Sequence, residues 1–255
     1  MLEPWVWGEM PVGFRKISWN YDWLMLVREG LDPHWIANTV LQSPGAGEEA
    51  SRHYGRGMLR RIRSEEGDNF LLRAYRHGGV LQRFTGEIYF TWPARPFREL
   101  IVTEMARQRG IPTLDILAAL VERTWGPFYR GWLVTRELGG AEDLWMALQK
   151  GDYTGDGRSL LMAVAKSIRQ MHLQGVYHAD LNLKNILVRR ENGEISATVI
   201  DFDKARLYSG EVPLGLANRN LNRLLRSVRK LDPGMQYLSE KDWVALTKFY
   251  QQKDC

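Results

Sequence analysis

The chain has 255 residues, of which 44% are apolar and 25% charged, as is ordinary for a soluble globular protein with one large or two small domains. Its single cysteine, Cys255, excludes an intramolecular disulfide; the lack of an apolar run of about 18 residues argues against a spanning helix, and Met1–Trp5 does not resemble a signal peptide. The net charge of +5 indicates an anionic partner, either nucleic acid, a phosphorylated ligand or an anionic membrane surface.

The first 35 residues are rich in tryptophan and contain five of the ten in the chain: Trp5, Trp7, Trp19, Trp23 and Trp35. Two interpretations are open for these side chains. They can belong to the core of a first lobe, or they can form an aromatic surface that contacts lipid headgroups, where amphipathic rings are enriched. The segment Ser43–Glu49 contains proline and two glycines and predicts a loop.

A Gly-x-Gly pair follows at Gly55 and Gly57, before an apolar and basic run that ends at Arg63. At a strand–turn–strand corner such glycines let backbone N–H groups approach a phosphate closely, although a plain hairpin turn explains them equally well. Asn69–Tyr75 is predicted to be the next strand. Within it, Arg73 stands where a kinase-like lobe places a lysine that binds the nucleotide phosphates. An arginine there is still a cation, but its fork would bind the phosphates differently.

The segment Pro96–Arg109 predicts a helix, because a proline stands at its start and a glycine follows its end. Two glutamates in it are candidates to pair with Arg73. Helical spacing puts Glu104 on the apolar side of the segment and Glu99 on another side, which favours Glu104 as the inward residue. A helix covered on more than one face would leave both open. The apolar side consists of Phe97, Leu100 and Ile101.

A short strand at Gly131–Leu138 runs into a loop and predicts the boundary between two lobes. We therefore expect an N-terminal nucleotide-gripping lobe at 1–136, which includes the tryptophan-rich segment 1–35, and a C-terminal catalytic lobe at 137–255.

The next helix is predicted from Ser159, a plausible N-cap, to Gln174, because Gly175 is a stop signal. Its apolar positions keep helical spacing: Leu160, Leu161, Val164, Ile168 and Met171. The helix would deliver the chain to His178, which we expect to brace the backbone of the following loop rather than to transfer protons.

A β-hairpin is predicted next, because the apolar runs Ile186–Val188 and Thr198–Ile200 flank a turn signal centred on Asn-Gly within Glu191–Glu194. The tight turn would bring the ends of both strands together. Asn185 and Asp201 would then face one space, with Asp180 on the loop that leads into the hairpin.

The types of these polar residues suit phosphoryl transfer. A carboxylate at Asp180 can orient an attacking hydroxyl and accept its proton, and Asn185 and Asp201 supply hard oxygen ligands for Mg²⁺. The spacing matches the protein-kinase signatures H-R-D-L-x-x-x-N and D-F-G, here His178–Asn185 and Asp201–Asp203. In the alternative interpretation, these residues only form a polar turn and a strand cap.

Fifty-two residues follow Asp203, too few for the activation segment and helical platform of a eukaryotic-style protein kinase. Within them, one helical stripe is apolar and consists of Leu221, Leu224, Leu225, Val228 and Leu231. Four cations lie opposite, namely Arg219, Arg223, Arg226 and Lys230, with Arg229 at the border. This cationic face is either simply solvated or contacts an anionic substrate or lipid.

With these residues in view, the chain resembles the bacterial lipopolysaccharide kinases, and among them most closely the 3-deoxy-D-manno-octulosonic acid (Kdo) kinases. The resemblance covers roughly residues 53–231. It rests on Gly55–Gly57, Leu72–Gly79, Arg95–Glu99, Gly110–Thr113, His178–Asn182, Val199–Asp203 and Asn220–Leu224. Two positions depart from the family pattern, Thr113 where valine is usual and His77 where arginine is usual.

The resemblance implies an α+β, protein-kinase-like fold of two lobes, with a small β-rich N-terminal lobe and a reduced, mainly helical C-terminal lobe. It implies that ATP phosphorylates the 4-hydroxyl of the Kdo residue of Kdo-lipid IVA, at the cytoplasmic face of the inner membrane, with the protein attached peripherally. The family register places its acidic helix residue eleven residues before Gly110, so Glu99 is preferred over Glu104 as the partner of Arg73.

Two alternatives remain. A heptose kinase of the lipopolysaccharide inner core is the nearest enzymatic one. The other is a non-catalytic basic protein that binds membrane or nucleic acid, although the complete set of Asp180, Asn185 and Asp201 argues against it and nucleic acid is not the expected partner. Ala179 also removes the arginine that would recognise an activation-loop phosphate, so switching of that kind is not expected.

Overall fold

The structure is a computed structural model, and it describes residues 10–19, 22–41, 59–63, 67–75, 89, 94–126 and 128–252. Gly55, Gly57 and His77 lie outside the described residues. The chain forms two compact units: the first consists of Met1–Met105 with Asp115–Glu137, and the second consists of Ala106–Leu114 with Leu138–Cys255. The assignment of a nucleotide-gripping and a catalytic lobe to the two halves of the chain stays a prediction.

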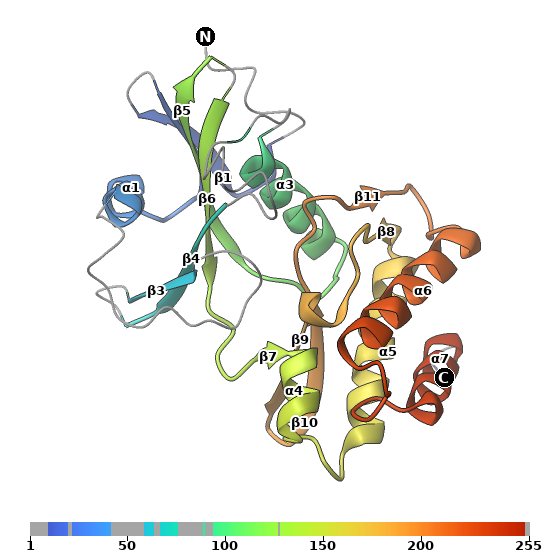
Figure 1. Cartoon of the computed structure of the whole chain (residues 1–255). Helices are drawn as coiled ribbons and strands as arrows, with labels where there is room; N and C mark the ends of the chain where they lie inside the picture. The colour runs from blue at the N-terminus through green and yellow to red at the C-terminus, as the bar shows by residue number, and fades with distance from the viewer. Residues whose placement is uncertain are drawn as a thin grey trace. The chain divides into compact units, whose positions relative to one another are not determined.

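The first unit is built on a six-stranded sheet in which all neighbouring strands are antiparallel (Figure 1). The strands, in spatial order, are β1 (Phe14–Trp19), β2 (Trp23–Arg28), β5 (Ile116–Trp125), β6 (Phe128–Arg136), β4 (Asn69–Ala74) and β3 (Leu59–Arg63). The predicted strand from Asn69 ends one residue earlier than expected. β6 begins before the predicted Gly131, because its pairing with β5 continues to the tip of their hairpin.

Both faces of this sheet are covered, each by one helix (Figure 1). Successive strand residues point to opposite faces, so that Leu24 and Leu26 of β2 join one apolar cluster while Met25 and Val27 join the other. The first cluster includes the apolar side of α3 (Arg95–Gln108), and the second includes buried residues of α1 (Pro33–Leu41). The sheet therefore has an apolar cluster and a helix packed on each of its two faces.

Two of the early tryptophans are half-buried against the core of the sheet, which favours the first of the two interpretations. Trp23 and Trp35 pack against the second cluster, and the Trp23 ring stacks on Trp132 with 5.2 Å between centroids. Trp5, Trp7 and the side chain of Trp19 lie outside the described residues.

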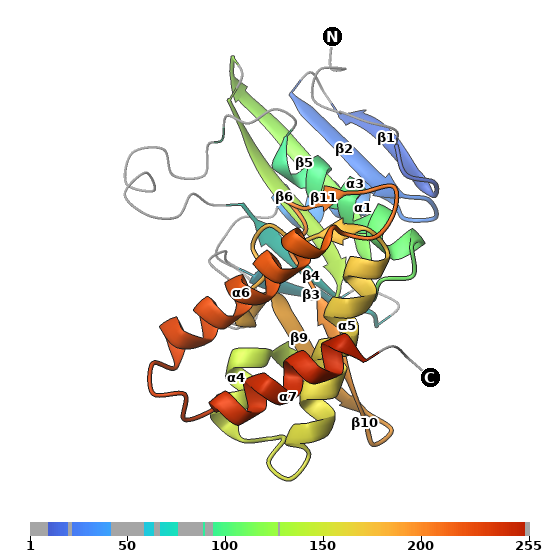
Figure 2. The same ribbon diagram turned by 90° about the vertical axis from the view of Figure 1, so that its right-hand side faces the viewer.

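The second unit is mainly helical, with two small sheets of order β10-β9-β7 and β11-β8. Figure 2 shows α7 lying across α5, with α6 beside them. In chain order the elements are β7 (Glu142–Asp143), α4 (Leu144–Lys150), α5 (Gly157–Leu173), β8 (Val176–Tyr177), the 3₁₀ turn η2 (Leu183–Asn185), β9 (Ile186–Glu191), β10 (Glu194–Val199), β11 (Arg206–Leu207), α6 (Leu214–Leu231) and α7 (Glu240–Gln251).

The prediction that Ser159 is the N-cap of α5 is wrong. The helix starts at Gly157, and Asp156 is the capping position, because the N–H of Leu160 already bonds to the Asp156 carbonyl at 3.0 Å. Ser159 therefore lies inside the first turn. The predicted stop is confirmed at Gly175, whose φ of +74° suits glycine. A side chain there would also clash, since a Cβ would lie 2.3 Å from the Gly210 carbonyl oxygen.

The predicted hairpin is formed by β9 and β10, with Glu191 paired to Glu194 at the turn and Ile186 paired to Val199 at the far end. The two turn residues Asn192 and Gly193 have φ of +51° and +83°, as a two-residue type I′ turn requires. The Asn-Gly signal thus fixes the register that brings the strand ends together.

Candidate active site

The catalytic loop comprises residues 178–185, between β8 and β9. Its conformation is stabilised by hydrogen bonds between its own side chains and its backbone. The carbonyl oxygen of Asp180 accepts from the side-chain amides of Asn182 at 2.8 Å and Asn185 at 2.9 Å. The Asn182 side chain in turn accepts from the N–H of Lys184 at 2.9 Å. The backbone at Asp180 is therefore held by the amide that the kinase motif places five residues later.

Asp201 is held beside this loop by the end of the hairpin. The N–H of Ile200 donates to the carbonyl oxygen of Asn185 at 3.0 Å, which extends the pairing of β9 and β10 by one step. Asp201 follows immediately with φ of +69°, a left-handed conformation that aspartate tolerates better than most residues. The expectation that the hairpin brings Asn185 and Asp201 together is confirmed for the backbone, and their metal-binding roles stay a prediction.

His178 braces the two segments, as the sequence predicts. Its Nδ1 accepts from the N–H of Asp180 at 3.1 Å, and its Nε2 donates to the carbonyl oxygen of Ile200 at 2.9 Å. Burial is the largest influence on the ring and lowers the pKa of His178, which keeps the imidazole neutral. With both ring nitrogens engaged and the side chain 1% exposed, proton transfer to a substrate is not a role for this residue.

The side-chain oxygens of the predicted catalytic residues are available for ligands. Asp180 is exposed, and Asn185 and Asp201 are half-buried. Within the described part of the chain, no hydrogen bond is donated to either carboxylate or to the Asn185 Oδ1, and no group of three or more His, Cys, Asp and Glu side chains is placed to hold a metal ion. The donor set is two carboxylates and one amide, which fits a hard ion that keeps water or phosphate among its ligands.

The residue that anchors the catalytic loop to α6 was not predicted from the sequence. Asn220 is fully buried; its Oδ1 accepts from the His178 N–H at 3.1 Å and from His172 Nε2 at 3.0 Å, and its Nδ2 donates to the His178 carbonyl at 2.6 Å. Ser227, two turns further along α6, accepts from the Leu183 N–H at 3.2 Å. The available signal in the sequence was an asparagine directly before the apolar stripe of the predicted helix, since an amide that is buried there needs hydrogen-bond partners.

His172 predicts a loss of stability in acid. Burial lowers its pKa to about 4, and because its Nε2 donates to Asn220, its Nδ1 accepts from the Tyr250 hydroxyl at 2.8 Å. The unfolded chain binds a proton here below its pKa of about 6.5, whereas the folded chain does so only below about 4. The free energy of unfolding should therefore fall between these pH values, by on the order of 3 kcal/mol from His172.

Urea unfolding of the wild type and of His172→Gln, measured from pH 7 to pH 4, checks this. We expect the variant to be less stable at pH 7 but to lose less stability between pH 6.5 and pH 4. The matched control His34→Gln, at an exposed position on α1, should keep the wild-type dependence on pH. Parallel curves for wild type and His172→Gln would contradict the assignment.

In the first unit, Arg73 of β4 pairs with Glu99 of α3, which agrees with the preference for Glu99. Glu99 is almost fully buried, and the Tyr75 hydroxyl donates to the same carboxylate oxygen. Arg73 also donates to the Tyr75 hydroxyl at 3.1 Å and lies over the Tyr75 ring, 4.9 Å from its centroid. The guanidinium is thus fixed from two sides, although its contact with a nucleotide stays a prediction.

Glu104 is equally buried but has a different partner. Arg28 of β2 binds Glu104 at 3.2 Å and Asp115 at 2.8 Å, and its guanidinium also donates to the Ile116 carbonyl. The helical-wheel preference for Glu104 as the partner of Arg73 is therefore wrong. The wheel failed because α3 is buried on more than one side, so that both glutamates point inward and are told apart only by the cation that each meets.

A strand–helix Arg–Glu pair in one unit, and a hairpin that follows an Asp-x₄-Asn loop and leads into Asp-Phe-Asp in the other, define a protein-kinase-like phosphotransferase. A solved structure described as "WaaP in complex with acyl carrier protein" has a similar fold, with a TM-score of 0.55, 19% identity, and coverage of 89% of this chain and 85% of the other. The prediction of a kinase-like α+β fold is confirmed.

The chain belongs to the lipopolysaccharide kinase (Kdo/WaaP) family, whose profile matches residues 47–250. A 3-deoxy-D-manno-octulosonic acid kinase of Pasteurella multocida is 34% identical over 203 residues, which are 77% of this chain and 82% of the relative. The enzyme of the same name from Vibrio vulnificus is 32% identical over 186 residues, 71% and 75% of the two chains. The protein is thus an ATP-dependent kinase of lipopolysaccharide biosynthesis.

Proposed function

We propose that this kinase transfers the γ-phosphoryl group of ATP to the 4-hydroxyl of the Kdo residue of Kdo-lipid IVA. The observation that supports this most is that the catalytic loop is hydrogen-bonded to the segment that leads into Asp201. The side-chain oxygens of Asp180, Asn185 and Asp201 accept no hydrogen bond from the described residues. The relatives named as Kdo kinases, at 28–34% identity, support the choice of sugar. Heptose kinase is the alternative that the experiment must separate.

Asp180 is proposed to act as the catalytic base. Its carboxylate orients the acceptor hydroxyl and accepts the proton as the oxygen attacks phosphorus, while His178 fixes the loop that carries it. Asn185 and Asp201 are proposed to hold Mg²⁺ through the Asn185 Oδ1 and the Asp201 carboxylate. When bound, the ion neutralises charge on the phosphate oxygens.

Arg73 is proposed as the cation for the nucleotide phosphates, held by Glu99 and Tyr75. A forked guanidinium presents several donors in one fixed plane and can bind two phosphate oxygens through parallel bonds, whereas a lysine acts as a point charge without that geometry. Gly55 and Gly57 are proposed to cover the phosphates with backbone N–H groups, as the sequence pattern predicts.

We propose that the protein works peripherally at the cytoplasmic face of the inner membrane, where a lipid-linked acceptor would be met. No helix among the described residues is long and apolar enough to span a bilayer. The net charge of +5 favours attraction to an anionic lipid surface.

The test is phosphorylation of defined acceptors by the purified protein. Kdo-lipid IVA and a heptosylated core acceptor are each incubated with ATP and Mg²⁺, and the site of the added phosphate is found by fragment mass spectrometry. We expect one phosphate on the Kdo unit of the first acceptor, formed at least ~10²-fold more slowly when Asp180→Asn replaces the wild type. Phosphate on heptose alone would replace this proposal with the heptose kinase, and no transfer to either acceptor would reject both.

A further inference from the structure

Four cations of α6 form one continuous row. Arg219, Arg223, Arg226 and Lys230 follow each other at spacings of four, three and four residues, which places them on a single stripe of the helix. No acidic residue occurs between Glu211 and Asp232 in the sequence. Within the described part of the chain, none of the four forms an ion pair, whereas Arg229 on another face pairs with Glu240 at 3.5 Å. These four residues are called the α6 cation row.

The row lies next to the part of α6 that carries the catalytic loop. Asn220 bonds to both backbone groups of His178, and Ser227 bonds to the N–H of Leu183. Arg223 stands three residues after Asn220 and four before Ser227, so it lies on the adjoining strip of the same helix. The position of the row relative to the catalytic loop is thus set within one unit, by two buried hydrogen bonds and one part-buried hydrogen bond.

Arg223 has an unsatisfied donor. Its side chain is half-buried, and its Nε is enclosed without a hydrogen-bond partner among the described residues. A buried donor without a partner is costly, and a charged donor more so. The enclosed Nε is closed to a ligand, so an anionic oxygen would meet the half-buried guanidinium at its two terminal nitrogens.

We propose that the α6 cation row is the docking site for the acidic groups of the acceptor, with Arg223 binding the sugar carboxylate. This rests on the proposed function, because an octulosonic acid carries a carboxylate. A guanidinium binds a carboxylate through two parallel N–H···O bonds, which are stronger than the attraction of a point charge. Arg219, Arg226 and Lys230 bind further anionic groups of the same lipid-linked acceptor.

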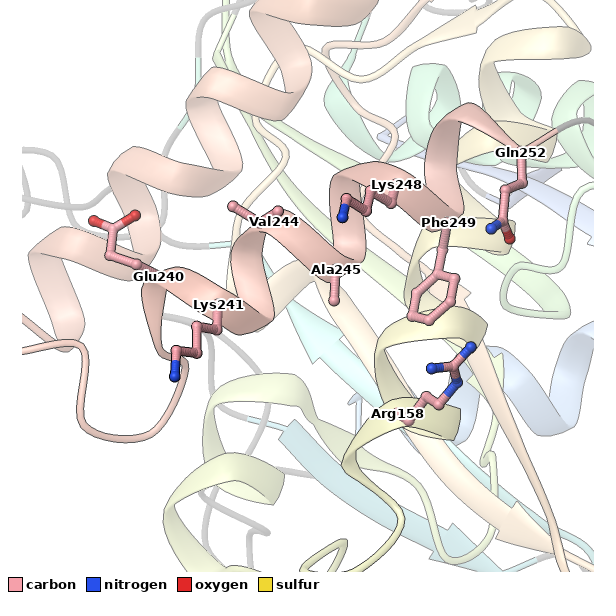
Figure 3. A pocket seen from close by; sticks show the side chains of 8 residues that line it. All are labelled: Arg158, Glu240, Lys241, Val244, Ala245, Lys248, Phe249 and Gln252. Carbon is pink, nitrogen blue, oxygen red and sulfur yellow. The ribbon is translucent and has the colours of Figure 1, made fainter.

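Another basic surface of this unit differs from the row. A groove of about 560 Å³ between α5 and α7 is lined by Arg158, Lys241 and Lys248, but Glu240 stands among them and none of the predicted catalytic residues lines it (Figure 3). The Arg158 guanidinium already lies over Phe249, 5.3 Å from the ring centroid. This groove supplies a matched control surface, because Lys241 and Lys248 are exposed cations on a helix of the same unit.

Steady-state kinetics test the proposal with the triple variant Arg219→Gln, Arg223→Gln, Arg226→Gln. We expect the KM for Kdo-lipid IVA to rise on the order of 10²-fold, at about fivefold for each charge removed. The kcat and the KM for ATP should stay within about twofold, since lost docking weakens binding without changing the reacting groups. The control Lys241→Gln, Lys248→Gln should keep all three constants, and an unchanged acceptor KM in the triple variant would overturn the proposal.

Arg223 is tested separately by Arg223→Lys and Arg223→Gln. Lysine keeps the charge but loses the fork, so its acceptor KM should lie between those of the wild type and the glutamine variant. Equal acceptor KM values for Arg223→Lys and the wild type would contradict the proposed contact between Arg223 and the sugar carboxylate.

Flotation with vesicles separates this inference from the proposed function, because it measures binding without catalysis. Neutral-lipid vesicles that contain Kdo-lipid IVA should bind the wild type and the control variant, and should bind the triple variant at least ~10-fold less. This result would support the docking site even if no phosphate were transferred. If the triple variant lost binding only to vesicles of anionic phospholipid without the acceptor, the row would be a membrane contact and the proposal would be wrong.

Discussion

Replacing Asp180 with asparagine is expected to lower kcat by at least ~10²-fold while the fold stays intact. The variant keeps the shape of the side chain but removes its ability to accept a proton. Folding should survive, because the hydrogen bonds that hold this position use the backbone of Asp180: its N–H binds His178, and its carbonyl oxygen binds Asn182 and Asn185. The measurement is initial rate at saturating ATP and acceptor, with circular dichroism as the check on folding.

Lys184→Gln is the matched control for this variant. Lys184 is exposed in the same loop, and the hydrogen bond that ties it to Asn182 uses its backbone N–H. Its rate should stay close to that of the wild type. Near-normal turnover by Asp180→Asn would remove Asp180 from the role of base.

Replacing Asp201 with asparagine should lower kcat by ~10²–10³-fold and raise the Mg²⁺ concentration needed for half-maximal activity. The reason is that an amide oxygen is a weaker ligand for a hard cation than a carboxylate. Asparagine is the appropriate substitution here, because Asp201 has φ of +69°, a conformation that asparagine also tolerates. The loss should therefore reflect chemistry and not backbone strain.

The Mg²⁺ dependence of the rate and the urea midpoint are measured together for Asp201→Asn and Asp201→Ala. Alanine is strained in the left-handed conformation, so only this variant should also lose stability. A wild-type Mg²⁺ requirement in Asp201→Asn would exclude Asp201 as a metal ligand.

The sequence predicted the hairpin at the centre of the site because its signals are local. Asn-Gly between two apolar runs determines the turn type, and the turn determines which residues meet. The strand with Arg73 and the helix with Glu99 could be located for similar reasons, from periodicity and from glycine and proline at the helix ends. Both elements could be predicted, with boundaries correct to within a few residues.

Features that depend on tertiary contacts were not predictable in this way. Glu99 and Glu104 are both buried, and only the fold shows that Arg73 meets one and Arg28 the other. Asn220 is a similar case, because its side chain makes three hydrogen bonds to two residues, His172 and His178, that lie at least 42 residues away along the chain. At Ser159, the preference of serine for N-cap positions led to a wrong start for α5. The helix begins at Gly157, and its first backbone hydrogen bond is accepted by Asp156.

The hydrogen bonds of His172 connect α7, the last described helix, to the backbone of the catalytic loop. A relay of hydrogen bonds runs from the Tyr250 hydroxyl on α7 through His172 to Asn220, and from Asn220 to His178. Shortening the protein before Tyr250 would leave the imidazole without its donor and would weaken the hydrogen bonds that hold the loop of Asp180, the proposed base. A truncated protein that keeps this relay must therefore retain α7, although none of the proposed catalytic residues lies on that helix.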